Sequence, residues 1–357
     1  MEKYFLTLEL VENYTAGSKA KVDVEYFLYQ YGFKKLNLYE GRTKTHKLAT
    51  FFKKLYDVPF NRKEKIILAA HYPLLNPVVL KIFVQILKLR KYDITLVGII
   101  HDIDSLRYQQ DKSVIQKEIR FLNMFDFLIS HNSAMTKWLV EQGFKGEIKE
   151  LELFDYKVDR KENVKKVKVD KLEGELKEVK YIITFAGNLD PQKSGFIYSL
   201  ENINFSDFLF YLYGPNFNDT QISEKNIIYK GVYKSDLLPL YLEGNWGLIW
   251  DGDSVKTCSG ALGNYLKYNS PHKLSLYIVA GLPVIIWSKA AAAELVKKYK
   301  IGVAIESLEE IPTKLRGISN EEYQKYIGNV LILAEKIKKG EFIIGAVNKI
   351  INSVEEV

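Results

Sequence analysis

Short apolar runs alternate with longer amphipathic stretches along this sequence, and the alternation occurs in two series. The runs are rich in branched and aromatic residues, a pattern typical of βα units built around a parallel sheet. The sequence therefore predicts an α/β protein with one sheet in each half. The predicted strands are residues 4–10, 35–39, 65–70, 94–100, 127–130 and 147–151 in the first series and 181–186, 208–213, 227–229, 246–250, 283–286 and 302–305 in the second. The predicted helices include 77–89, 134–142 and one that starts near Ser235.

The segment between the two series, residues 155–180, is dense in lysine and glutamate and poor in apolar residues other than valine. Such a composition predicts a linker with a solvated surface. A chain of 357 residues also exceeds the size at which one hydrophobic core keeps growing. We therefore expect two Rossmann-like domains facing a central cleft, with functional loops at the carboxyl ends of the strands. The domains are expected at residues 1–155 and 156–339, and the helix at about 340–357 is expected to pack back on the first domain.

Composition narrows the class of protein. The chain is 47% hydrophobic and 27% charged, and its longest apolar runs fall short of the roughly 20 residues that a membrane-spanning helix needs. Acidic residues interrupt the apolar N-terminus, which argues against a signal peptide, and Cys258 is the sole cysteine, which suits a reducing cytoplasm. The 51 basic and 44 acidic residues are spread out, so a net charge of +7 gives little support for nucleic-acid binding. We expect a cytoplasmic protein without a transmembrane segment.

Residues 269–287 are the most informative segment of the second series. A helix that begins with Pro271 in its first turn and stops at Gly281 leads directly into a buried strand. The start of such a helix offers unpaired backbone N–H groups and a partial positive charge, and Lys273 would add an exposed cation in the same turn. This combination suits a diphosphate. The alternative is an ordinary αβ unit in which His272 and Lys273 are merely solvated.

This run resembles the donor-binding end of GT-B glycosyltransferases. More narrowly, four motifs together resemble the glucosyltransferases that extend O-linked N-acetylglucosamine on bacterial serine-rich-repeat adhesins, a group whose relatives are often called galactofuranosyltransferases. The motifs are Ser-Pro-His-Lys-Leu at 270–274, Trp-Asp-Gly-Asp at 250–253, His-Asp-Ile-Asp-Ser-Leu-Arg at 101–107 and Phe-Asp-Tyr at 154–156. They are specific as a set, and the resemblance spans nearly the whole chain.

The resemblance implies a metal-independent hexosyltransferase of the GT-B fold with an N-terminal acceptor domain and a C-terminal donor domain. UDP-glucose is the expected donor and a substrate, no cofactor is expected, and the acceptor is expected to be a glycoprotein or glycan. The sequence departs from many retaining relatives at Leu276, where those enzymes place a glutamate. The usual ribose contact is then missing, so the stereochemistry of transfer and the identity of the nucleotide stay open.

Further loops are candidates for donor binding. Gly187 permits a close backbone approach to a phosphate, Asn188 can donate a hydrogen bond, and Lys193 matches the lysine of a Gly-x-Leu-x-x-x-Lys pattern in related enzymes, although these residues could also form a simple turn. The carboxylates of Asp251 and Asp253 could hold a metal, but contact of Asp251 with sugar hydroxyls is the preferred interpretation and no metal is expected. The predicted donor-binding residues are Thr15, Gly17, Gly187, Asn188, Lys193, Tyr213, Gly214, Val232, Tyr233, Asp251, Asn269, Ser270, Pro271, His272, Lys273 and Leu274.

The first series carries candidates for acceptor activation. His71 and the pair His101 and Asp102 follow or end predicted strands at the same expected edge. An inverting transfer needs a base within hydrogen-bond reach of the acceptor hydroxyl; Asp102 is the first candidate, with His101 and His71 in reserve, although either histidine could be a core residue. The predicted acceptor-binding residues are Tyr72, Ser105 and Arg107, and Asn132 is predicted to be a helix cap rather than a site residue.

Several alternatives remain at this level. Galactofuranosyl or N-acetylglucosaminyl transfer in the synthesis of a surface polysaccharide fits the same residues. So does a nucleotide-sugar epimerase of this architecture, which would release no nucleotide in proportion to acceptor. A non-catalytic partner of a glycosyltransferase would be expected to lose its phosphate-binding lysines, whereas Lys193 and Lys273 are both present. A homo-oligomer is expected, of a size that the sequence leaves open.

Overall fold

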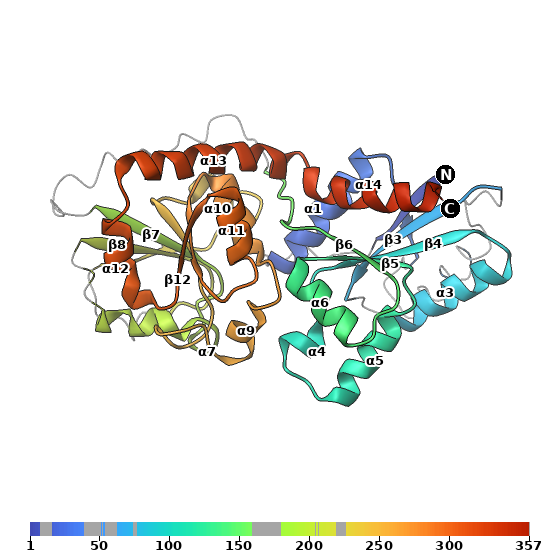
Figure 1. Cartoon of the computed structure of the whole chain (residues 1–357), viewed down its shortest axis with the longest axis horizontal. Coiled ribbons are helices and arrows are strands. Elements are labelled where there is room, and N and C mark those ends of the chain that lie inside the picture. The colour runs from blue at the N-terminus through green and yellow to red at the C-terminus, as the bar shows by residue number, and fades with distance from the viewer. Residues whose placement is uncertain are drawn as a thin grey trace. The chain divides into compact units, whose positions relative to one another are not determined.

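The computed structural model describes residues 1–7, 16–38, 51, 53, 63–73, 77–158, 180–203, 205, 207–218 and 226–356. The chain divides into two compact units (Figure 1). The first unit includes Gly17–Glu152 and Gly340–Val357, and the second includes Leu153–Lys339. Among the described helices, none combines the length and the apolar content that crossing a bilayer requires.

In the first unit, six described strands form one parallel sheet in the order β2-β1-β3-β4-β5-β6. Every residue of the central β3 is buried, because helices lie on both faces of the sheet (Figure 1). The strands are β1 (Glu2–Thr7), β2 (Lys34–Asn37), β3 (Ile66–Tyr72), β4 (Ile94–Ile100), β5 (Phe127–Ser130) and β6 (Glu147–Glu150), and the helices include α1 (Ala16–Gln30), α3 (Pro77–Leu89), α4 (Asp104–Arg107), α5 (Lys112–Leu122), α6 (Ser133–Glu141) and α14 (Glu341–Glu355).

In the second unit, six described strands form another parallel sheet in the order β12-β11-β10-β7-β8-β9. Its strands are β7 (Tyr181–Ala186), β8 (Phe208–Tyr213), β9 (Ile227–Gly231), β10 (Trp246–Ile249), β11 (Val284–Trp287) and β12 (Gly302–Ile305). Its helices include α7 (Pro191–Ser194), the 3-10 helix η1 (Gly195–Asn202), α8 (Leu238–Tyr241), α9 (Gly260–Tyr265), α10 (His272–Ala280), α11 (Ala293–Tyr299), the 3-10 helix η3 (Leu308–Glu310), α12 (Ile311–Arg316) and α13 (Asn320–Lys338).

The predicted fold class is confirmed, because both series form fully parallel sheets with helices between the strands. Two local predictions are also confirmed. Gly281 ends α10 in the left-handed conformation, with φ of 83°. The side chain of Asn132 caps α6 by accepting a hydrogen bond from the backbone N of Met135 at 3.1 Å.

Two predicted helix starts are wrong. A helix was expected from near Ser235, but α8 begins at Leu238, which places Pro239 in the first turn, where its missing N–H costs nothing. Pro271 was expected inside the first turn of the next helix; it is instead the residue before α10, with an extended ψ of 138°. Of the predicted linker, residues 159–179 lie outside the described part of the chain, as do the ends of the first two predicted strands.

The C-terminal α14 packs against β6 of the first unit. The Nζ of Lys65 donates a hydrogen bond to the carbonyl of Val354 at 2.8 Å and so fixes the end of this helix. At its start, Gly340 has φ of 76°, and a Cβ there would lie 2.5 Å from the ring of Phe27. A glycine is therefore required both by the backbone conformation and by the contact with α1.

Candidate active site

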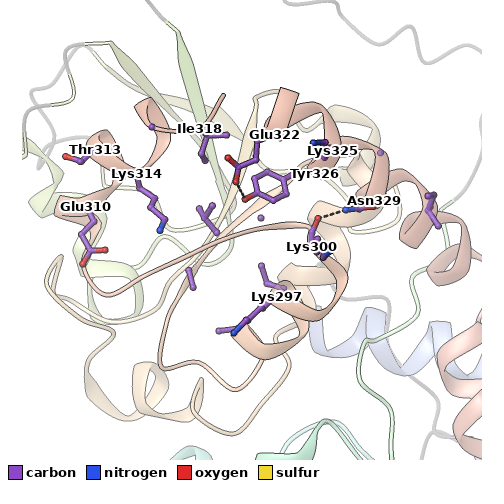
Figure 2. Close-up of a pocket in the computed structure, with 18 residues that line it drawn as sticks. Lys297, Lys300, Glu310, Thr313, Lys314, Ile318, Glu322, Lys325, Tyr326 and Asn329 are labelled. Atoms are coloured by element: carbon purple, nitrogen blue, oxygen red, sulfur yellow. Dashed lines mark hydrogen bonds between the residues drawn. The ribbon is translucent and has the colours of Figure 1, made fainter. Parts of the chain in front are cut away.

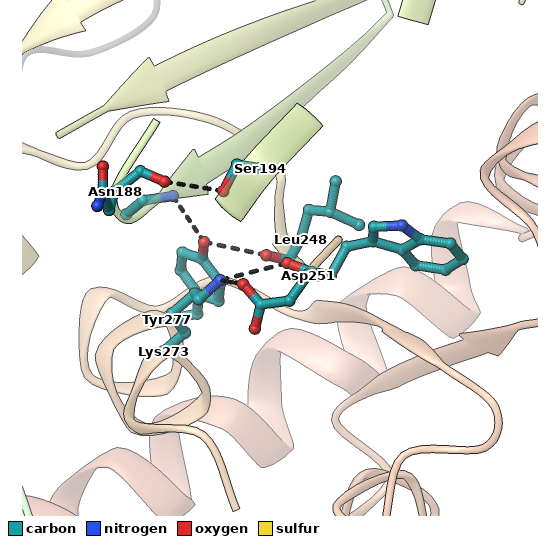
Figure 3. A network of polar contacts seen from close by, with 8 residues as sticks. Asn188, Ser194, Leu248, Asp251, Lys273 and Tyr277 are labelled. Atoms are coloured by element: carbon teal, nitrogen blue, oxygen red, sulfur yellow. Dashed lines mark hydrogen bonds and ion pairs between the residues drawn. The ribbon is translucent and has the colours of Figure 1, made fainter. Parts of the chain in front are cut away.

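The loop between β7 and α7 is held in a fixed shape by its own hydrogen bonds. The backbone N of Gly187 donates to the carbonyl of Tyr213 at 2.9 Å, which joins this loop to the end of β8. The Oγ of Ser194 donates to the carbonyl of Asn188 at 2.8 Å (Figure 3), and the Asn188 side-chain oxygen accepts from the backbone N of Asp190 at 3.0 Å. Since Asp190 in turn caps α7, the loop is preorganised before any ligand binds.

Gly214 makes the closest backbone contact of this region. It has φ of 136°, and a Cβ at this position would lie 1.8 Å from the carbonyl oxygen of Gly187. Real Cβ atoms do not approach a backbone oxygen so closely, so the loops after β7 and β8 lie in direct contact because residue 214 is a glycine. This is a physical reason for the glycine that the sequence alone did not reveal.

We expect Gly214→Ala to separate these two loops and to weaken UDP binding together with the thermal stability of the protein. The matched control is Gly231→Ala, because Gly231 also has a positive φ, of 91°, but a Cβ there meets no atom within 4 Å. Backbone strain of about 1–3 kcal/mol is common to both changes, so any further loss in Gly214→Ala measures the contact. Equal melting temperatures and equal UDP affinities for the two variants would contradict this account.

Lys273 lies at the second position of α10 and turns inward. Its Nζ forms an ion pair with the Asp251 carboxylate at 3.0 Å and donates to the Trp250 carbonyl at 3.3 Å, just beyond β10 (Figure 3). The amine also lies 4.4 Å from the centre of the Phe185 ring. The expectation that Lys273 is exposed is corrected: its side chain is only 14% exposed, because its amine bonds to groups at the end of β10.

Tyr277 links the strands on which this cluster rests, and the sequence analysis missed it. Its hydroxyl accepts a hydrogen bond from the backbone N of Ala186 at 2.8 Å and donates to the carbonyl of Leu248 at 3.1 Å (Figure 3). Burial raises the pKa of this phenol, so it stays protonated and can donate. A Cβ on Gly247 would lie 2.3 Å from its ring. The sequence signal that could have identified Tyr277 is its spacing of four residues from Lys273, which places both side chains on one face of the helix.

Some predicted donor residues lie in the protein interior. The side chain of Leu274 is fully buried in the core, and its assignment as a donor contact stays a prediction. Tyr213 is also buried, and its hydroxyl bonds to the carbonyl of Tyr241 and the backbone N of Glu243, at 3.2 and 3.1 Å. Its ring is packed in the interior at the end of β8, and its assignment as a donor-binding residue stays a prediction.

The other predicted donor residues have more varied surroundings. Tyr233 stacks on Tyr241 at 4.7 Å, and Val232 is exposed. His272 is not merely solvated, since its ring stacks on Tyr156 at 4.9 Å. Ser270 and Pro271 are buried, and Asn269 donates its backbone N–H to the carbonyl of Tyr265. Lys193 is half-buried, and its carbonyl accepts a hydrogen bond from the backbone N of Gly252. Gly17 lies in the first turn of α1, whereas Thr15 lies outside the described residues.

The two carboxylates of the Trp-Asp-Gly-Asp turn have different partners. Asp251 is engaged by Lys273, whereas Asp253 accepts a hydrogen bond from the hydroxyl of Ser259. Within the described ranges, no group of three or more histidine, cysteine, aspartate or glutamate side chains has an arrangement that could hold a metal ion. The Asp251 carboxylate therefore acts here as the counter-charge that positions a lysine.

In the first unit, His71 and His101 form a buried pair. The Nδ1 of His71 and the Nε2 of His101 are 2.8 Å apart, and the Nε2 of His71 lies 3.4 Å from the Glu25 carboxylate. Burial lowers the pKa of His71, although Glu25 acts in the opposite direction. If Glu25 accepts from His71 Nε2, the Nδ1 of His71 must accept from His101, so the contacts fix both rings. The sequence predicted that the two histidines lie at the same edge of the sheet, but it did not predict their contact with Glu25.

Asp102 follows β4 and forms an ion pair with Arg107 at 2.6 Å. Its side chain is 27% exposed, which leaves part of the carboxylate accessible. Arg107 is similarly exposed. Because both residues belong to one short segment, the guanidinium of Arg107 orients the carboxylate and offsets its charge. Of the three catalytic candidates, Asp102 has this accessible position, whereas both histidines are buried.

Two of the predicted acceptor-binding residues, Tyr72 and Ser105, are buried, and their contact with an acceptor stays a prediction. Glu118 of α5 organises both: it accepts a hydrogen bond from the Tyr72 hydroxyl and another from the backbone N of Ser105, the latter at 3.0 Å. Burial, reinforced by the Glu118 charge, raises the pKa of Tyr72. These residues shape the segment that carries Asp102 and do not face solvent.

Comparison with known proteins places both units in one group. A family model described as Glucosyltransferase 3-like, N-terminal domain, matches residues 3–153, and one described as Glucosyltransferase 3-like, C-terminal domain, matches residues 183–350. The chain is 34% identical over 297 residues to the Beta-1,6-galactofuranosyltransferase WbbI of Escherichia coli K12, covering 82% of this chain and 81% of the relative. It is 24% identical over 264 residues to Glucosyltransferase 3 of Streptococcus parasanguinis, covering 71% and 69%.

A solved structure extends the likeness to the fold. The crystal structure of HepE from Anabaena in complex with UDP and glucose matches over 100% of both chains, with a TM-score of 0.61 and 12% sequence identity. At that identity the match speaks for the architecture alone. The two parallel α/β units are those of the GT-B fold.

Proposed function

Because this chain belongs to the glucosyltransferase 3-like family of glycosyltransferases, we propose that it transfers glucose from UDP-glucose to a glycan acceptor. Family and fold together make it a nucleotide-sugar glycosyltransferase. The proposed acceptor is O-linked N-acetylglucosamine on a serine-rich-repeat adhesin, in keeping with the motifs at 101–107, 154–156, 250–253 and 270–274. The UDP-sugar is a substrate, and no cofactor is proposed.

The observation that carries the proposal is the position of the Lys273 amine. A Cβ on Gly187 would lie 3.7 Å from this Nζ, so the space left by the glycine borders a cation. Negative charge grows on the β-phosphate as the nucleotide departs, and donors already in place stabilise it without reorganisation. We assign this role to Lys273, to Lys193 and to the backbone N–H groups at the start of α10. Asp251 keeps Lys273 in position until the phosphate arrives.

Acceptor activation is proposed for Asp102 in the first unit. An inverting reaction requires a base that removes the proton of the acceptor hydroxyl. The partly exposed carboxylate of Asp102, oriented by Arg107, can serve as that base. The buried pair of His71 and His101 fixes the backbone on which Asp102 stands, since the backbone N of His101 also donates to the Tyr72 carbonyl at 2.8 Å.

A second donor deserves a parallel test. The relative WbbI, named a Beta-1,6-galactofuranosyltransferase, is more similar over a longer stretch than Glucosyltransferase 3 of S. parasanguinis. This favours UDP-galactofuranose as the second candidate. Leu276 is buried in α10, so no carboxylate stands where many retaining relatives place one, and the stereochemistry must be measured on the product.

We expect UDP and the true UDP-sugar to raise the melting temperature of the protein in the presence of EDTA. The ligands that we assign to the diphosphate are lysines and backbone N–H groups, which need no metal. At a ligand concentration of 100 times Kd, the stabilisation is about 2.7 kcal/mol, or several degrees. A thermal-shift screen of UDP, UDP-glucose, UDP-galactofuranose and UDP-N-acetylglucosamine measures it. A strict requirement for Mg²⁺ or Mn²⁺ would refute the metal-independent site and make Asp251 and Asp253 candidate ligands.

A further inference from the structure

A groove of about 1300 Å³ lies in the second unit, between β12 and the helices α11, α12 and α13 (Figure 2). β12 ends the sheet order of the described strands, so one of its edges is unpaired. Ile305 and Ile301 accept hydrogen bonds from Ser288 and Val284 on the β11 side, at 2.7 and 3.0 Å. Backbone groups alternate along a strand, so those of the even-numbered residues 302 and 304 point toward the groove.

The rim of the groove is basic. Lys297, Lys300 and Lys314 are exposed around it (Figure 2), and none of them forms an ion pair with another residue in the described ranges. The carboxylate of Glu322 instead accepts a hydrogen bond from the Tyr326 hydroxyl at 2.6 Å. This bond leaves the charge of Glu322 in place, so the carboxylates of Glu310 and Glu322 oppose the three lysines. A fourth lining lysine, Lys325, forms an ion pair with Glu321 at 2.9 Å. A positive electrostatic potential therefore remains over the groove.

The lining of the groove also includes apolar side chains. These side chains come from Val296 of α11, from Ile318 between α12 and α13, and from Ile332 of α13. Ile332 is 65% exposed, so it offers apolar surface to an occupant of the groove. Lysines beside an open strand can simply prevent edge-to-edge aggregation. Such protection needs neither a hollow of this size nor exposed isoleucine, and these two features point to an occupant.

We propose that this groove binds an extended, acidic polypeptide segment of a partner protein, which adds to β12 as a further strand. Backbone hydrogen bonds to residues 302 and 304 would supply the pairing, and alternate side chains of the segment would face the apolar lining and the lysines. A second copy of this chain is a poorer occupant. A two-fold contact through this groove would bring two sets of the same lysines together, and like charges oppose association.

The first test uses fluorescence anisotropy with a labelled peptide of alternating glutamate and valine, and a matched peptide with lysine in place of glutamate. We expect saturable binding of the acidic peptide and affinity for the basic one lower by about tenfold or more. The triple variant Lys297→Glu, Lys300→Glu, Lys314→Glu should lose a similar factor. The matched control reverses three exposed lysines outside the groove, Lys336, Lys339 and Lys349, and should bind nearly as the parent does.

The second test separates strand addition from charge attraction. Ala304→Pro removes an N–H that points to the groove and leaves the bonds to β11 in place, so the sheet should persist. We expect the acidic peptide to bind about tenfold or more weakly to this variant, while UDP affinity and melting temperature stay close to those of the parent. Ala304→Ser keeps the N–H and should bind normally.

Several outcomes would overturn the proposal. They are equal binding of the acidic and basic peptides, undiminished peptide binding by Ala304→Pro, and a dimer of the parent chain that Ala304→Pro dissociates in analytical ultracentrifugation. If Ala304→Pro does not fold, the lysine reversals decide, because these exposed side chains contribute little to the core. Neither test measures sugar transfer, so failure of the groove proposal is distinguishable from failure of the proposed enzymatic function.

Discussion

Replacing Asp102 by asparagine is expected to slow sugar transfer by roughly a hundredfold or more, the range found when a general base is removed, while UDP affinity stays nearly unchanged. Asparagine has the shape of aspartate but cannot accept the proton of the acceptor hydroxyl. The residue follows β4 at the carboxyl end of a parallel strand, where sites of this fold class lie. Arg107 can still donate a hydrogen bond to the amide oxygen, so the segment should keep its shape.

The measurement is the rate of transfer at saturating donor, together with a calorimetric titration of UDP. Asp104→Asn provides the matched control, because Asp104 lies two residues away in α4 and the change removes the same charge. It should leave the rate within a few-fold of the parent. Transfer by Asp102→Asn at the parent rate with normal acceptor affinity would make Asp102 structural, and the base would then be sought at His71 or His101.

Lys273→Ala is expected to weaken UDP binding and turnover together. Loss of one charge-assisted contact to phosphate costs about 1.5–3 kcal/mol, or roughly tenfold to more than a hundredfold in affinity. The ion pair with Asp251 adds a second effect. Without the lysine, the mostly buried Asp251 carboxylate loses its cation, so the variant should also melt at a lower temperature than the parent.

A double variant separates the two effects. Lys273→Ala combined with Asp251→Asn removes both charges and should recover part of the lost stability, but not the UDP affinity. Asp251→Asn alone keeps the lysine but loses the carboxylate that positions it, so it should bind UDP more weakly than the parent and more tightly than Lys273→Ala. Calorimetric titration of the four proteins gives the comparison. UDP affinity that is the same in the parent and in Lys273→Ala would remove Lys273 from the proposed donor site.

Much of the fold could be predicted from periodicity. The strands β4, β5, β7, β8 and β12 have the bounds predicted from the sequence, because buried strands of a parallel sheet are apolar throughout and end at polar or turn residues. The order of the strands in each sheet was not predicted, since it depends on which strands pair across long stretches of sequence. The helix expected near Ser235 was wrong because Pro239 fixes the start of α8 instead.

The candidate site was less accessible to sequence reasoning. Its glycines and lysines stand out as motifs, but their contacts depend on residues distant in the chain. Lys273 meets Asp251 from another loop, and Tyr277 joins the ends of β7 and β10. In the first unit, Glu25 reaches His71 from α1. Tertiary packing determines which side chains meet in each case, and no local pattern encodes it.

The most direct test of the central claim counts products. The parent protein is incubated with the UDP-hexose that stabilises it most and with a serine-rich peptide carrying N-acetylglucosamine, and both UDP and hexosylated peptide are quantified by mass spectrometry. A glycosyltransferase must form one molecule of UDP for each hexose transferred, so we expect equimolar products and no UDP without acceptor. Conversion of the UDP-hexose to its epimer without release of UDP, or release of UDP that does not depend on any glycan acceptor, would contradict the account.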